Sequence, residues 1–182
     1  MEFTLYYKGS LKSNGNREEK HKIRRFFHKQ LKKLWTKEPW KEFSDSLRID
    51  SKNTIIKKVS PFQFAPLVCK DFYFIAELKI NLLRPEPTGS IVMNMGDIDN
   101  RLKTLLDSLK SPTEPGELPD NASPSKEEKP FFCLLEDDSL ITAINIRTSQ
   151  ILIPNFPEKE VIILIDVEVK KIRTLMGGME FS

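Results

Sequence analysis

Two stretches of this chain alternate apolar and polar residues with a period of two, and they constrain the fold more than any other feature. Residues 71–83, DFYFIAELKINLL, place apolar and polar side chains on opposite faces. Residues 160–171, EVIILIDVEVKK, alternate even more cleanly. Successive side chains of a strand point to opposite faces, so both stretches predict long strands with one buried face. The apolar positions of the second stretch are Val161, Ile163, Ile165, Val167 and Val169.

Two other segments have helical periodicity. Asn16, followed three residues later by Glu19, is typical of a capping box and predicts a helix over about residues 17–36. A second helix is predicted to start near Asp97 and to end near Lys110. Apolar positions of the first are Ile23, Phe26, Phe27, Leu31, Leu34 and Trp35, and those of the second are Ile98, Leu102, Leu105, Leu106 and Leu109.

The order of these elements predicts a mixed α/β (α+β) fold, one domain over residues 1–182 with a mixed sheet flanked by helices. Further strands are expected around Phe3–Tyr7 and over residues 139–148. Prolines interrupt residues 37–68, where the pattern gives no prediction. Residues 111–130 contain five prolines and five acidic residues and are expected to form a disordered acidic loop.

Composition adds limits on location and chemistry. No apolar run approaches the 18 or so residues of a membrane span, so a soluble, cytoplasmic protein without a membrane partner is expected. Cys69 and Cys133 are far apart in sequence and are interpreted as reduced packing residues. Trp35, Trp40 and Phe43 are assigned to the core.

Positive charge is concentrated near the N-terminus. Between Lys8 and Lys37 eleven Lys and Arg face two acidic residues, although the whole chain carries only +3. This clustering favours an anionic partner such as a nucleic acid. The alternative is a solvated helix face that only keeps the protein soluble. The candidate phosphate-binding side chains are Lys22, Arg25, Lys29, Lys32 and Lys33.

Acidic residues gather on the second predicted helix and before a later strand. Asp99, Lys103 and Asp107 are spaced four residues apart, which predicts one exposed stripe along the helix, with Asp97 at the start of the helix. Asp138 belongs to the acidic turn LLEDD. Clustered carboxylates can hold Mg²⁺ and activate water for phosphodiester cleavage, and a nearby lysine can neutralise a phosphate oxygen. A helix cap and an i, i+4 surface ion network remain the structural alternative.

The segments DIDNRLKTLLDSL and LLEDDSLITAINI together resemble the RusA family of Holliday junction resolvases. In that family an Asp-x-Asp-Asn opens a helix that carries a Lys and a further Asp, and an Asp-Asp pair leads into a strand. The corresponding residues here are Asp97, Asp99, Asn100, Lys103, Asp107 and Asp138.

The resemblance implies a magnesium-dependent endonuclease that resolves Holliday junctions in DNA recombination and repair. It implies catalytic roles for Asp97, Asp99, Lys103, Asp107 and Asp138, and a Mg²⁺ site on Asp97, Asp99 and Asp138 in which Mn²⁺ can substitute. It also implies a compact mixed sheet and a homodimer, since symmetric cleavage of a four-way junction needs two sites on a two-fold axis.

Two departures from the family pattern keep other functions open. Residues 111–130 stand where the family has a short glycine-containing link, and MNMG stands where arginines often precede the first aspartate. One alternative is a non-catalytic junction-binding relative that uses the basic helix 17–36. Another is a protein-interaction module that recruits a partner through the proline-rich loop.

Overall fold

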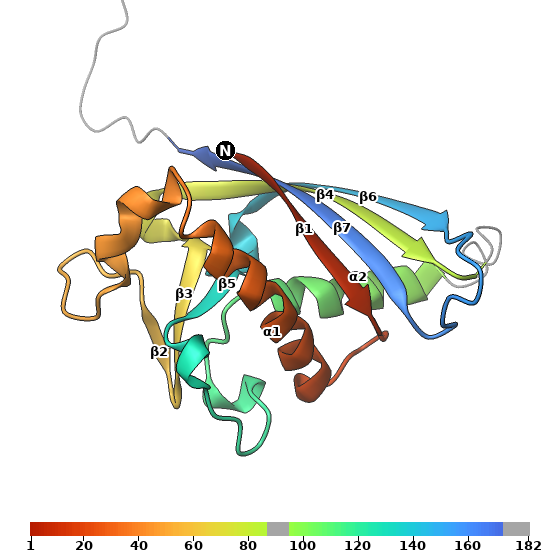
Figure 1. Cartoon of the computed structure of the whole chain (residues 1–182), viewed down its shortest axis with the longest axis horizontal. Helices are drawn as coiled ribbons and strands as arrows, with labels where there is room; N and C mark the ends of the chain where they lie inside the picture. The colour runs from red at the N-terminus through yellow and green to blue at the C-terminus, as the bar shows by residue number, and fades with distance from the viewer. Residues whose placement is uncertain (87–94, 173–182) are drawn as a thin grey trace, which may run out of the picture.

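The computed structural model describes residues 1–86 and 95–172, with only the backbone for 95–97. It forms a mixed α/β fold, as the sequence predicts (Figure 1). No helix of this described part combines the length and apolarity needed to cross a bilayer. The strands and α-helices are β1 (Glu2–Gly9), α1 (Arg17–Leu34), β2 (Lys57–Val59), β3 (Phe62–Val68), β4 (Phe74–Arg84), α2 (Met95–Leu109), β5 (Phe131–Leu135), β6 (Ile141–Gln150) and β7 (Val161–Lys171).

The two alternating stretches form the centre of a four-stranded sheet with the order β1-β7-β4-β6. β7 pairs antiparallel with β1 and β4, whereas β4 pairs parallel with β6. The predicted apolar face of β7 is buried throughout, and Ile163 and Ile165 are fully covered. This burial confirms the one-sided pattern, with α1 and α2 on the covered face.

A second sheet, with the order β2-β3-β5, lies beside the first, where the sequence predicts a single sheet. β3 and β5 pair parallel and are apolar almost throughout, as expected of strands buried on both faces. Their short apolar runs carry no alternation, and Pro66 interrupts β3. β2 pairs with β3 only as far as Phe64, so Pro66 lies in the part of β3 that has no partner on that side. A missing N–H is tolerated there.

The helix α1 begins as predicted. The Asn16 side chain accepts a hydrogen bond from the Glu19 N–H at 3.0 Å, and the Glu19 carboxylate accepts one from the Asn16 N–H at 3.1 Å, so the capping box is complete. Trp35 and Trp40 are buried beside this helix, as assigned, with exposed fractions of 4% and 2%. The core side chains contributed by α1 and α2 include Ile23, Phe27, Leu31, Leu105 and Leu109.

Residues 111–130 differ from the prediction of a disordered loop. The structure describes the whole segment, with 3₁₀ turns at Pro115–Glu117 and Lys126–Glu128. Leu118 is buried in a small apolar cluster with Phe62, Phe64 and Phe131. Three of the segment's five acids form ion pairs with α1, namely Asp120, Glu127 and Glu128. Apolar anchoring and these ion pairs offset the conformational entropy that the segment loses when it is ordered.

We expect Ile165→Ala to lower the free energy of unfolding by about 2–5 kcal/mol, because it leaves a cavity between β1 and β4. Leu164→Ala is the matched control, since its side chain is on the outer face and 36% exposed. Urea unfolding followed by circular dichroism measures both. Equal losses for the two variants would contradict the assigned face.

Candidate functional site

The predicted acidic residues of α2 do not share one environment. Asp99 and Lys103 are exposed, one turn apart, as predicted. Asp97 falls inside α2, which begins at Met95, and its side chain lies outside the described residues. Asp107 is only 20% exposed and faces α1, because its position on the helical wheel is rotated from that of Asp99. The predicted exposed stripe is therefore shorter than expected.

Asp107 forms ion pairs with two lysines that the sequence analysis did not single out. Its Oδ2 atom lies 2.8 Å from Lys20 Nζ, and its Oδ1 atom lies 3.6 Å from Lys110 Nζ. Lys110 Nζ also lies 3.7 Å from Asp138 Oδ2. Lys110 thus joins the acid of the helix to the acid of the turn, and its place just after the helix is the sequence feature that could have pointed to it.

Asp138 is the more accessible member of the Asp-Asp pair. The Asp137 side chain accepts a hydrogen bond from the Ser139 N–H at 2.9 Å, and hydrogen bonding by Ser139 lowers the pKa of Asp137. The Asp138 side chain is 50% exposed. Within the described part of the chain, its one ion pair is with the Lys110 ammonium. Of the two acids, Asp138 is the one positioned to bind an external group.

The Asp-Asp turn lies beside α2, on the helix-covered side of the sheet. The Ser111 N–H donates to Leu135 O at 2.9 Å, and the Ser111 hydroxyl donates to Glu136 O at 3.2 Å. Leu106 and Asp138 line the same shallow hollow. These contacts place the turn at the C-terminal half of α2.

Asp99 lies too far from this turn to bind the same metal ion as Asp138. It precedes Leu106 by seven residues, which is about 10 Å along a helix axis. Accordingly, in the described residues the carboxylates of Asp99, Asp107 and Asp138 do not gather within the spacing of ligands to a single ion. The structure brings Asp107 and Asp138 together through Lys110 and leaves Asp99 apart.

Three other potential ligands do gather, at Cys69, Asp71 and Glu136, with ligand atoms within 4.8 Å of one another. A cation is already present there, because Lys57 Nζ lies 3.0 Å from Asp71 Oδ2 and 3.1 Å from Glu136 Oε1. Burial raises the pKa of the Cys69 thiol to about 12, so the sulfur stays protonated. This group is best described as a lysine-centred ion pair network.

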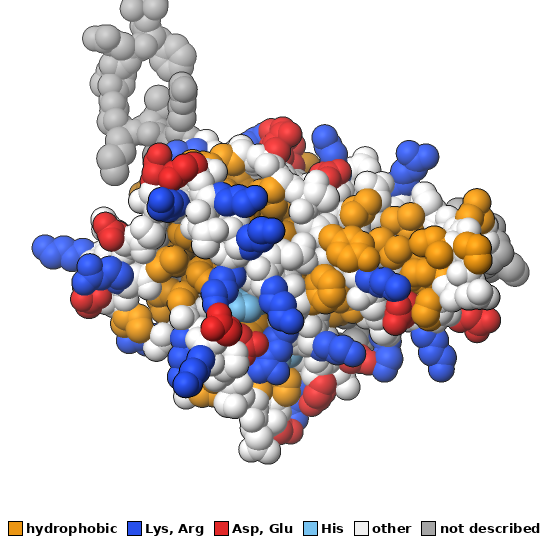
Figure 2. All heavy atoms as spheres, in the orientation of Figure 1, with side chains coloured by type: hydrophobic (Ala, Val, Ile, Leu, Met, Phe, Trp, Pro, Cys, Tyr) orange, Lys and Arg blue, Asp and Glu red, His pale blue; other side chains and the backbone are white. Residues whose placement is uncertain are grey.

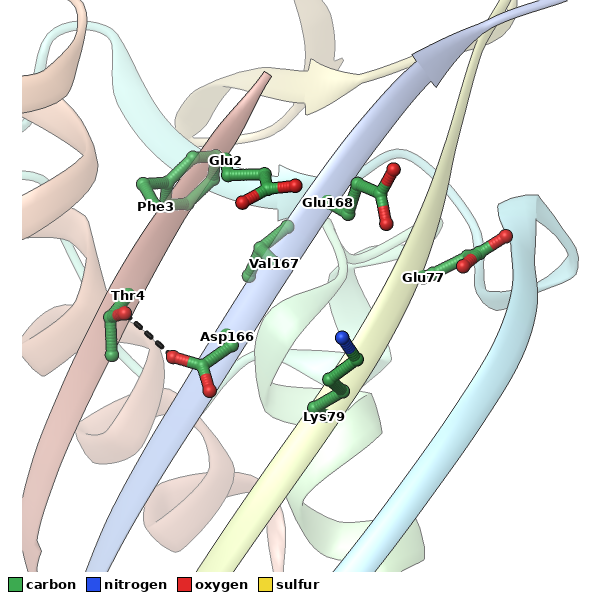
Figure 3. A pocket seen from close by; sticks show the side chains of 8 residues that line it. All are labelled: Glu2, Phe3, Thr4, Glu77, Lys79, Asp166, Val167 and Glu168. Carbon is green, nitrogen blue, oxygen red and sulfur yellow. Dashed lines mark hydrogen bonds between the residues drawn. The ribbon is translucent and has the colours of Figure 1, made fainter.

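A hollow on the outer face of the four-stranded sheet is lined by more acidic than basic side chains. Figure 3 shows this hollow, whose acidic side chains come from β1, β7 and β4, with both helices behind the strands. The Thr4 hydroxyl donates to Asp166 Oδ1 at 2.6 Å, and Lys79 lies among the acids. Lys170, on the same outer face, lies 2.7 Å from Glu77 Oε1 and 3.4 Å from Glu168 Oε1, so part of this negative charge is neutralised within the protein. The acids are Glu2, Glu77, Asp166 and Glu168.

The segment 111–130 covers part of the cationic face of α1. Of the five predicted phosphate-binding residues, Lys22, Lys29 and Lys33 are exposed. The other two pair with the segment: Arg25 Nε donates to Glu128 Oε1 at 2.8 Å, and Lys32 binds the Glu127 carboxylate. Figure 2 shows the basic side chains over α1 with acidic ones among them.

Two histidines of α1 are buried against the second sheet. His28 Nδ1 accepts a hydrogen bond from the Phe132 N–H at 2.9 Å, whereas His21 Nε2 has no hydrogen-bond partner in the described residues. His21 packs between Phe62 and Phe131. Burial lowers the pKa of His21 to about 4 and also lowers the pKa of His28, so both rings are neutral near pH 7.

Comparisons of the chain with models of protein families, with curated proteins and with solved structures find no match.

We expect His21 to make the protein less stable in acid. Its folded-state pKa of about 4 lies below the ordinary value of 6.5, so protonation stabilises the unfolded chain and stability falls as the pH decreases from 6.5 towards 4. His21→Gln should reduce the loss between about pH 7 and about pH 4.5 by about 2–3 kcal/mol.

Urea unfolding of both proteins at the two pH values measures this difference. An equal loss of stability in wild type and variant would show that His21 does not carry the acid sensitivity.

Proposed function

We propose that this chain is a magnesium-dependent endonuclease that cuts branched DNA, of the Holliday junction resolvase type. The order of its acidic residues, which resembles the RusA pattern, motivates the proposal. The observation that supports it most is the position of the Asp-Asp turn, which lies beside α2 on the helical side of the sheet. A turn on the outer face would have separated Asp138 from α2 by the sheet itself.

The donor chemistry of the proposed site fits a hard divalent cation. Asp97, Asp99 and Asp138 would supply carboxylate oxygens, which Mg²⁺ and Mn²⁺ prefer, and Asp99 and Asp138 are on the surface. The bound ion would supply an activated water and compensation for charge on the scissile phosphate. For one ion to bind all three acids, Asp99 and the Asp-Asp turn would have to lie closer together along α2 than they do in this structure.

The chain's own residues would bind and orient the phosphate backbone. Lys103 is exposed one turn after Asp99 and is positioned to contact a phosphate oxygen near that acid. Lys110 balances the charge of Asp107 and Asp138. The exposed cations of α1 would add affinity that is independent of sequence, and a homodimer would present two such sites to a four-way junction.

We expect Asp99→Asn to reduce cleavage of a synthetic four-way junction in Mg²⁺ by about a hundredfold or more, because one charged metal ligand is lost. Junction binding in EDTA should change little. Asp45→Asn, an exposed acid on the 3₁₀ helix Trp40–Leu47, is the matched control and should cut normally. Gel assays with Mg²⁺ and with Mn²⁺ measure cutting, and a wild type inactive with both metals would count against the nuclease.

A second candidate function is junction or DNA binding without cleavage. It is favoured by the separation of Asp99 from Asp138 and by the acidic segment paired to α1. In this case binding depends strongly on salt and no metal supports cutting. The same assays distinguish the two functions, since only the nuclease requires Asp99.

A further inference from the structure

A cationic cavity lies between the first turns of α1 and the end of α2. Its volume is about 360 Å³, and it is separate from the exposed helix face discussed above. Four cations and two carboxylates line it, so its lining carries a net positive charge. The lining residues are Arg17, Lys20, Arg24, Asp107, Lys110, Gly116 and Glu117.

Arg24 is the most unusual residue of this cavity. It is only 2% exposed, although it carries a full positive charge. Its Nη2 donates to Asp107 O at 2.8 Å and its Nε donates to Lys110 O at 3.1 Å, so it caps the carbonyls at the end of α2. Among the described residues no carboxylate forms a salt bridge with it, and burial of a cation without an anionic partner is costly.

The other cations converge around the same space from α1 and from the end of α2. Arg17, Lys20 and Arg24 are spaced three and four residues apart, so they share one stripe of α1. Arg17 lies in the first turn, where the helix dipole favours an anion, and its guanidinium binds the Asp120 carboxylate of the segment 111–130. Lys20 and Lys110 already hold one anionic group, the Asp107 carboxylate, between them. The cavity therefore has the donors that a tetrahedral oxyanion requires.

We propose that this cavity binds a phosphate group, and that the group is a backbone phosphate of the DNA substrate. The second part rests on the proposed nuclease function. Lys110 contacts both Asp107 in the cavity and Asp138 in the turn, so a phosphate bound here lies next to the candidate site. The cavity would fix the register of the DNA strand relative to Asp138. A free phosphate compound offers the same chemistry and is the other source of such a group.

The test combines Arg17→Gln and Lys20→Gln in one variant of the full chain. Binding of a fluorescent four-way junction is measured by anisotropy in EDTA over a range of salt concentrations. We expect weaker binding and a slope of log affinity against log salt that is shallower by about 1–2, the loss of one or two phosphate contacts. The double variant Lys52→Gln with Lys58→Gln removes two exposed lysines elsewhere and should leave the slope near that of wild type.

A second measurement distinguishes the source of the phosphate. Inorganic phosphate is added to wild type and to the Arg17/Lys20 variant, and thermal unfolding is recorded. Stabilisation of wild type alone, with an unchanged junction slope, would assign the cavity to a free phosphate compound and overturn the DNA assignment. No stabilisation together with an unchanged slope would overturn the phosphate site altogether.

These measurements do not depend on cleavage. A shallower slope in a protein that never cuts would support the cavity and reject the nuclease. An unchanged slope in a protein that cuts the junction would reject the phosphate site in the cavity and support the nuclease. Circular dichroism of each variant confirms that it folds, and Arg24→Lys, which keeps the charge, is expected to retain more junction affinity than Arg24→Gln.

Discussion

The burial of one face of β4 and β7 is the constraint on which the rest of the structure depends. These strands lie in the middle of the larger sheet, and their apolar side chains are covered by α1, α2 and the second sheet. Because a strand alternates its side chains, covering one face necessarily directs the polar residues to the other. The charged outer face, with Lys79, Asp166 and Glu168, is a direct consequence of this alternation. The same burial therefore separates the polar face of the larger sheet from the apolar face that α1 and α2 cover.

The parallel pair β3 and β5 then sets the position of the acidic turn. β5 is buried completely and ends at Leu135, directly before Glu136, and an isolated bridge joins Leu135 to Lys110. Chain continuity leaves the turn no position other than the end of α2. The cation at this position, Lys110, is consequently shared by Asp107 and Asp138.

The sequence predicted the parts of the fold that depend on periodicity or on local hydrogen bonding. The capping box at Asn16 and the alternating face of β7 were predicted and are confirmed. β3 and β5 were missed because a strand buried on both faces has no alternation to detect, and proline further obscures β3. The segment 111–130 was predicted to be disordered because its composition is that of a solvated loop. Its order depends on partners distant in sequence, such as Arg25 for Glu128.

The candidate site shows the same division between local and distant information. The exposure of Asp99 and Lys103 on one helix follows from their spacing, whereas the orientation of Asp107 towards Lys20 depends on how two helices pack. Arg24 is the clearest case, since its place in a run of basic residues suggests an exposed cation, yet it is buried against the end of α2. Its guanidinium donates there to the carbonyl oxygens of Asp107 and Lys110 and forms no ion pair with an acid among the described residues.

The electrostatic arrangement also bears on how a polyanion would approach. The hollow on the outer face of the larger sheet is acidic, and the segment 111–130 supplies acidic partners to Arg17, Arg25 and Lys32 on α1. The exposed cations of α1 include Lys22, Lys29 and Lys33, and the cavity around Arg24 adds others. A DNA strand that passes from this cavity towards Asp138 would follow Lys110, the residue that connects the two. The ion pairs within the protein would compete with such a strand, so the salt-dependent part of its affinity would come from the cations whose partners a phosphate can replace.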